Sequence, residues 1–147
     1  MNRTSGAVRK ERYMQLAGQP LRTSAGCTLR DAGVDWDAVR VPRRIGMRAV
    51  MILGPRCGAV VEDPLTCVLY WFVTPGTAWD VADTNVLGVG ATVTIPPPRV
   101  TQGGGLRWRV CPGDSDWLTD AHALRAALED CQAAPQGRAA LVEEPVR

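Results

Sequence analysis

The sequence predicts an α+β fold, with a mainly antiparallel sheet of about four strands flanked by helices. First, short apolar and β-branched runs gather between residues 58 and 110. Second, apolar residues at helical spacing occur on both sides of these runs, over residues 42–53 and 119–131. Third, 147 residues with 46% hydrophobic content suit one domain with a substantial core.

The N-terminal part is predicted to contribute little to this core. Ser5 suits the cap of a short helix over residues 7–17, and residues 19–35 are rich in Gly and polar residues, as in a linker. We therefore expect a basic helix and linker over residues 1–35, a single α+β domain over residues 36–132, and a flexible tail over residues 133–147.

The first helix of the domain is expected over residues 42–53. Pro42 fits the first turn, and the Gly54-Pro55 pair ends the helix. One face is apolar, at Ile45, Ala49, Val50 and Leu53. Another side carries Arg43, Arg44 and Arg48.

A hairpin follows, with strands over residues 58–62 and 67–73 joined by the turn "DPLT". The second strand, "CVLYWFV", is apolar on both faces. Such a strand is either central and covered on both sides, or covered on one side and open to a partner on the other.

Two further strands and a helix complete the prediction. A strand over residues 91–95 is stopped by three prolines, and residues 106–110 form the return strand after a glycine bend. Alternation puts Leu106, Trp108 and Val110 on one face of that strand, and Arg107 and Arg109 on the other. Thr119 or Asp120 caps the last helix, which ends near Cys131.

Cysteine and histidine usage argues against a metal site. The five cysteines form no CxxC pair, and His122 is the single histidine. Zinc sites need clustered ligands, so we expect free thiols in a reducing cytoplasm, and no metal or cofactor. We expect neither a membrane span nor a signal peptide, because no apolar run approaches the length of about 18 residues that a span needs and none follows the basic N-terminal residues.

The basic residues are almost all arginine, since Lys10 is the only lysine among 17. GC-rich coding, as in actinobacteria, accounts for this, and phosphate recognition by the arginine fork is the functional alternative. Residues 1–48 carry ten basic and four acidic side chains, whereas residues 49–147 carry seven and eleven. This asymmetry permits an anionic partner.

Basic side chains are the best candidates for a nucleic-acid or anion site. Single-stranded nucleic acid is bound by basic grooves interleaved with aromatic residues. The candidates are Arg43, Arg44, Arg48, Arg99, Arg107 and Arg109. Solvated arginines on exposed faces are the competing interpretation, because Trp108 points away from Arg107 and Arg109.

Acidic residues mostly suit local roles. Asp35 with Asp37, and Asp114 with Asp116, lie next to expected helix starts, where acids act as caps. A metal-dependent enzyme using Glu62, Asp80 and Asp83 is the weakest hypothesis. It requires these acids and Arg107 to converge in one cleft.

Two stretches resemble a known family. "VLYWF" and "GATVTIPPPRVTQGGGLRWRV" are similar to the second half of bifunctional DNA primase–polymerase (Prim-Pol) domains, here of an actinobacterial type. Residues 69–71 align with the family pattern "G-x-H-x-Y-F", and residues 90–98 align with "D-x-x-x-x-G-G-Y-V-V-A-P-P-S". The resemblance covers residues 58–110.

The resemblance implies a shortened relative without the catalytic set. The family's histidine falls on Val68, its last aspartate on or near Asn85, and its acidic pair only on Glu62 and Asp63. The leading hypothesis is a non-catalytic cytoplasmic protein that binds nucleic acid or a replication or regulatory partner. The alternative is a protein-interaction module, such as a homodimer, suggested by the two-sided apolar strand and five tryptophans.

Overall fold

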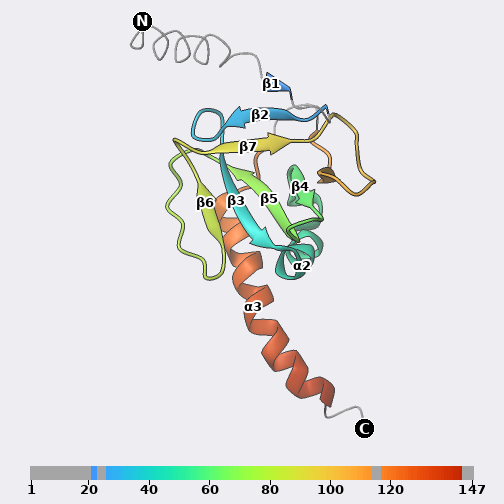
Figure 1. The fold of residues 1–147 in the computed structure, drawn as a ribbon. Coiled ribbons are helices and arrows are strands. Elements are labelled where there is room, and N and C mark those ends of the chain that lie inside the picture. The colour runs from blue at the N-terminus through green and yellow to red at the C-terminus, as the bar shows by residue number, and fades with distance from the viewer. Residues whose placement is uncertain (1–20, 23–25, 114–116, 144–147) are drawn as a thin grey trace, which may run out of the picture.

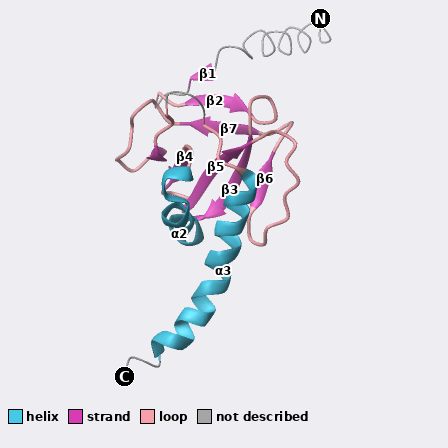
Figure 2. Cartoon of the chain, turned by 180° about the vertical axis from the view of Figure 1, so that it is seen from behind, coloured by secondary structure: helices cyan, strands magenta, loops and turns pink. Residues whose placement is uncertain are grey.

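The computed structural model describes residues 21–22, 26–113 and 117–143. Over these residues the fold is α+β, with antiparallel sheets and α-helices arranged in three layers (Figure 1). Helices α2 (Arg43–Leu53) and α3 (Ala121–Glu143) cover one face of the larger sheet, as the view from behind shows (Figure 2). The smaller sheet lies over the opposite face.

The larger sheet has five strands in the order β6-β3-β5-β4-β8, and all pairings are antiparallel. Its strands are β3 (Asp37–Pro42), β4 (Val60–Asp63), β5 (Val68–Val73), β6 (Asn85–Leu87) and β8 (Arg107–Val110). The smaller sheet has the order β1-β2-β7, with β1 (Leu21–Arg22), β2 (Thr28–Asp31) and β7 (Thr92–Ile95).

Strand β5 lies at the centre and separates two hydrophobic cores. Leu69, Trp71 and Val73 pack against the helices, whereas Phe72 packs under the smaller sheet. The apolar run predicted from "CVLYWFV" is therefore a central strand covered on both sides, and it leaves neither face to a partner.

Several predicted elements are confirmed within a residue or two. Helix α2 begins directly after Pro42, and Gly54 ends it with φ of +54°. The hairpin of β4 and β5, strands β7 and β8, and the start of α3 also lie where the sequence places them. Among the described residues, no helix has both the length and the apolar composition to cross a bilayer.

The predicted linker over residues 19–35 is wrong, because β2 pairs along its whole length with β7. Strands β3 and β6 were also missed, and β3 is a central strand between β5 and β6. Its sequence, "DAVRVP", mixes charged residues and a proline into the apolar pattern. At the other end, α3 continues to Glu143, through most of the segment predicted as a tail. The helix expected over residues 7–17 lies outside the described residues.

Strand β8 carries an irregularity that moves one predicted side chain. Val61 pairs with Trp108 but Val60 pairs with Val110, so Arg109 is the extra residue of a bulge. Val110 consequently packs against the helix-side core, while Leu106 and Trp108 join the core under the smaller sheet. The prediction that all three share a face is wrong for Val110.

Gly46 is required by packing between α2 and β5. A Cβ at this position would lie 2.7 Å from Leu69 Cδ1 and 3.2 Å from Trp71 Cζ3, and both side chains are fully buried. Gly46→Ala should destabilise the protein by about 1–3 kcal/mol, although alanine favours helices. Urea unfolding would measure this change. Met51→Ala, at an exposed position of the same helix, should change stability by less than about 0.5 kcal/mol. If Gly46→Ala instead stabilised the protein, the packing of α2 against Leu69 and Trp71 would have to leave room for a methyl group.

Candidate functional site

A buried carboxylate surrounded by arginines forms the first candidate site. Glu62, on β4, is fully buried and makes ion pairs with Arg43 at 2.6 Å, Arg109 at 2.8 Å and Arg107 at 3.3 Å. The three arginine side chains are partly exposed, at 44%, 33% and 22% respectively. We call these four residues the Glu62 cluster.

Strand alternation brings the cluster together. Glu62 shares the helix-facing side of β4 with Val60, and Arg107 is its partner across the β4–β8 pair. Arg109 extends from the same strand, and Arg43 is the first residue of α2. Arg107 is held further by its Nη1, which donates to the Gly103 carbonyl at 2.7 Å. The glycine bend therefore supports the cluster.

Glu62 remains ionised although it is buried. Burial raises the pKa of its carboxyl, but hydrogen bonds from Arg43, Arg107 and Arg109 outweigh this and hold the pKa at about 2. One negative charge thus faces three positive charges. The cluster carries an excess of two positive charges at a partly exposed position.

The other three arginines predicted as anion-binding residues lie outside this cluster. Arg44 follows Arg43 on α2 and is exposed, Arg48 lies further along the helix, and Arg99 lies in a loop with φ of +65°. Within the part of the chain that the structure describes, none of these three makes an ion pair. Their guanidinium groups are available to an anion.

The acids proposed as metal ligands do not gather with Glu62. Asp80 pairs with Arg125 on α3, and Asp83 lies in a loop with φ of +64°. No group of three potential ligands among His, Cys, Asp and Glu occurs in the described ranges. Of the four residues whose convergence was in question, only Glu62 and Arg107 meet.

The other polar residues singled out have local roles. Asp120 accepts a hydrogen bond from the Ala123 N–H at 2.9 Å, as predicted for the N-terminal cap of α3. Capping is wrong for Asp37, which begins β3, is buried, and accepts the Gly76 N–H. Asp114 and Asp116 lie outside the described residues. His122 and Cys111 are exposed, and all five cysteines are free thiols.

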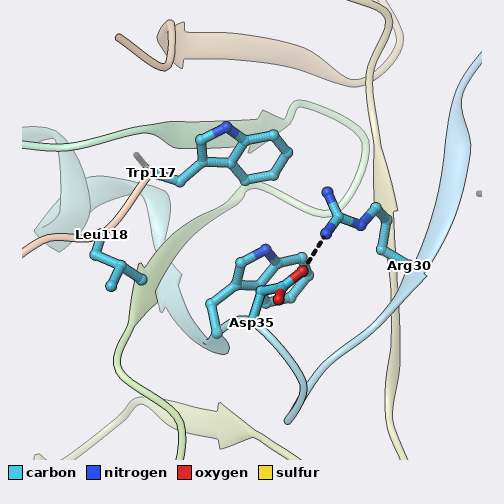
Figure 3. Close-up of a pocket in the computed structure, with 5 residues that line it drawn as sticks. Arg30, Asp35, Trp117 and Leu118 are labelled. Atoms are coloured by element: carbon cyan, nitrogen blue, oxygen red, sulfur yellow. Dashed lines mark hydrogen bonds and ion pairs between the residues drawn. The ribbon is translucent and has the colours of Figure 1, made fainter. Parts of the chain in front are cut away.

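A second candidate site is aromatic and lies on the other side of the larger sheet. The rings of Trp36 and Trp117 are stacked, with centroids 6.2 Å apart and planes 17° from parallel. Phe72 meets both edge-on, at 4.7 and 5.3 Å. The Arg30 guanidinium carbon lies 5.7 and 5.3 Å from the two indole centroids, and Arg30 pairs with Asp35 at 2.8 Å (Figure 3).

Two pockets adjoin at these residues, because Arg30 and Trp117 line both. The smaller, of about 260 Å³, is completed by Asp35, Trp36 and Leu118. The larger, of about 410 Å³, has mainly apolar walls. These walls are Gly26, Thr28, Ile95, Pro96, Pro97, Pro98, Trp108 and Pro112. We call the two pockets together the Arg30–Trp117 groove.

Backbone contacts fix Trp117 against β4. Its carbonyl accepts the Ala59 N–H at 3.1 Å, and the adjacent Gly58 N–H donates to Thr119 Oγ1 at 2.8 Å. A Cβ at Gly58 would lie 2.7 Å from the Trp117 carbonyl oxygen, so only glycine permits this approach. On the far wall, Trp108 Nε1 donates to the Pro97 carbonyl at 3.1 Å. The groove is therefore built on anchored walls.

Sequence reasoning missed this groove. Arg30 lay in the predicted linker, Trp36 between two acids assigned to capping, and Trp117 in a polar segment before the last helix. Arg30 comes from β2, Trp36 from the residue directly before β3, and Trp117 from the segment before α3. No local pattern relates them.

Comparisons with protein-family models, with curated proteins and with solved structures found no match.

Removing the charge of Glu62 tests the cluster. Glu62→Gln leaves three arginines without their counter-ion and should destabilise the protein by about 3–5 kcal/mol at pH 7. Because the folded pKa is depressed from 4.5 to about 2, the stabilisation is fully present above pH 4.5 and is lost as the pH falls toward 2.

Urea unfolding at pH 7 and at steps between pH 5 and pH 2 would measure the difference between wild type and variant. The difference should shrink across this window. Glu129→Gln, at an exposed pair on α3, is the matched control and should change stability by less than about 0.5 kcal/mol. A constant difference between pH 5 and pH 2 would contradict an ionised Glu62.

Proposed function

We propose that this is a non-catalytic cytoplasmic protein that binds nucleic acid through an arginine surface centred on the Glu62 cluster. The observation that carries the proposal is the excess of two positive charges around one buried carboxylate. Arg44 and Arg48 lie on the same helix as Arg43, and in this proposal they extend the positive surface. Free thiols at all five cysteines support a reducing compartment.

Guanidinium groups suit this role because their planar fork binds phosphate oxygens bidentately. The partial exposure of Arg43 and Arg109 leaves donors accessible beside those that hold Glu62. Contacts of this kind set affinity and orientation on a phosphate backbone without reading sequence. We therefore expect salt-sensitive binding with little sequence preference.

The role of Glu62 supports a binding function over a metal-dependent one. In the resemblance to primase–polymerase domains, Glu62 and Asp63 are the only acids at the position of the metal-binding pair. Glu62 is fully buried and its oxygens are engaged by three arginines. A carboxylate held in this way stabilises the fold, and its oxygens are not free to bind a metal ion. In this proposal the scaffold is a primase–polymerase relative that acts by binding, and a replication or regulatory protein is its other candidate partner.

The protein-interaction alternative, such as a homodimer, has less support. Its first ground was the two-sided strand β5, both faces of which are covered within the chain. Its second was the five tryptophans, of which Trp36, Trp71 and Trp108 are buried in the cores. These residues are accounted for by packing.

Filter binding at about 50 and 200 mM salt tests the proposal, with single- and double-stranded DNA as probes. Binding should be tight at the lower concentration and weaken steeply at the higher. Arg44→Gln alone, and Arg44→Gln with Arg109→Gln, should weaken binding to both probes. Each lost phosphate contact should reduce the slope of log affinity against log salt by about 1.

Arg125→Gln is the matched control, because it removes the same charge from α3, where Arg125 pairs with Asp80. It should bind as wild type does. Equal weakening in all three variants would indicate a general charge effect, and no binding to either DNA at low salt would refute the proposal.

A further inference from the structure

We propose that the Arg30–Trp117 groove is the base-stacking site for single-stranded nucleic acid, with a base on the Trp117 indole and its phosphate on Arg30. The inference rests on the proposed function and adds a second subsite to it. The groove lies on the opposite side of the larger sheet from the Glu62 cluster. It would convert general phosphate binding into a preference for unpaired strands.

The spacing of the rings decides where a base fits. A base sandwiched between two indoles needs about 6.8 Å, twice the 3.4 Å rise of stacked bases. The Trp36 and Trp117 centroids are 6.2 Å apart, so a base does not enter between them without movement. The larger pocket also borders Trp117 and holds about 410 Å³. Phe72 and Trp108 each meet the Trp117 ring edge-on, with centroids 5.3 Å away. In this proposal a base stacks on the part of the Trp117 ring that lines the larger pocket.

The walls of the larger pocket suit a flat apolar face. The proline rings contribute surface without backbone donors, because proline lacks an N–H. The backbone N–H of Trp108 is already satisfied, since it donates to the Val100 carbonyl at 2.8 Å. The hydrogen bond from Trp108 to the Pro97 carbonyl holds this wall in place. Stacking on such surfaces tolerates any base, since every base has a π-face.

Arg30 supplies the charge that an apolar groove alone lacks. Its partner Asp35 has a side chain that is 66% exposed, and exposed ion pairs contribute only about 0–1 kcal/mol. A phosphate can therefore replace Asp35 at little cost. The contacts of Arg30 with the Trp36 and Trp117 rings remain during this exchange and keep the guanidinium at the junction of the two pockets.

The preference for single strands follows from access. In a duplex, both faces of a base are stacked on its neighbours, and exposing one face costs a few kcal/mol. The Glu62 cluster contacts phosphates, which both forms present. Variants of the groove should therefore affect single strands selectively, and variants of the arginine surface should affect both forms.

Quenching of tryptophan fluorescence by a short oligo(dT), with a blunt-ended duplex of two complementary strands as the paired probe, tests the groove in the whole chain. Trp117→Ala should weaken oligo(dT) binding about 10-fold or more and leave duplex binding unchanged. Trp117→Phe, which keeps a stacking ring, should retain affinity within about 3-fold while losing most of the quenching. Arg30→Gln should weaken oligo(dT) binding and reduce the salt slope by about 1.

Trp79→Phe is the matched control, because Trp79 is half-buried near the helix-side core, and it should leave both affinity and quenching unchanged. Thermal unfolding would verify that each variant is folded. If Trp117→Ala is unfolded, Trp117→Phe and Arg30→Gln decide the question.

Unchanged oligo(dT) binding in folded Trp117→Ala and Arg30→Gln variants would overturn the groove, while loss in the Arg44→Gln/Arg109→Gln variant would leave the proposed function intact. Quenching by a proline-rich peptide and not by oligo(dT) would also overturn it, and would assign the groove to a protein ligand. Failure of every DNA probe to bind would refute both proposals.

Discussion

The structure depends on keeping one ionised carboxylate inside the protein. Moving a carboxylate out of water costs several kcal/mol unless charged partners and hydrogen bonds replace the lost hydration. Glu62 meets this requirement with arginines from the start of α2 and from β8. The ion pairs therefore tie β4 to an edge strand and to a helix that lie far apart in the sequence. Loss of all three ion pairs would leave a buried charge uncompensated.

Strand β8 connects this constraint to the aromatic groove. Its side chains alternate, so Arg107 and Arg109 reach Glu62 on one side while Trp108 forms a wall of the groove on the other. The bulge at Arg109 lets Val110 return to the helix-side core. On the adjoining segment, Gly58 permits the close approach that fixes Trp117 beside β4. Strands β4 and β8 therefore help to hold both candidate sites in place.

The sequence predicted the elements that obey local rules. Helix α2 has a proline start, an apolar stripe and a glycine stop, and the β4–β5 hairpin has a turn between two apolar runs. Strand β3 was missed because Asp37, Arg40 and Pro42 interrupt its pattern, although four of its residues are almost fully buried by neighbours distant in sequence. The same limit applies to the sites. Arg43, Arg107 and Arg109 were selected for their charge. Nothing in the sequence marked Glu62, the last residue of the predicted strand over residues 58–62, as the buried carboxylate that gathers them. The groove joins three segments that only the fold brings together.

The number of arginines around Glu62 exceeds what burial requires. One bidentate arginine neutralises a carboxylate, and each additional guanidinium within a few ångströms repels those already present. In the free protein, solvent access to Arg43 and Arg109 reduces this repulsion, since both side chains are at least one-third exposed. A bound phosphate would reduce it further by supplying the missing negative charge. An arrangement selected only for stability would place fewer cations at this position, so the surplus charge is the feature that stability alone does not explain.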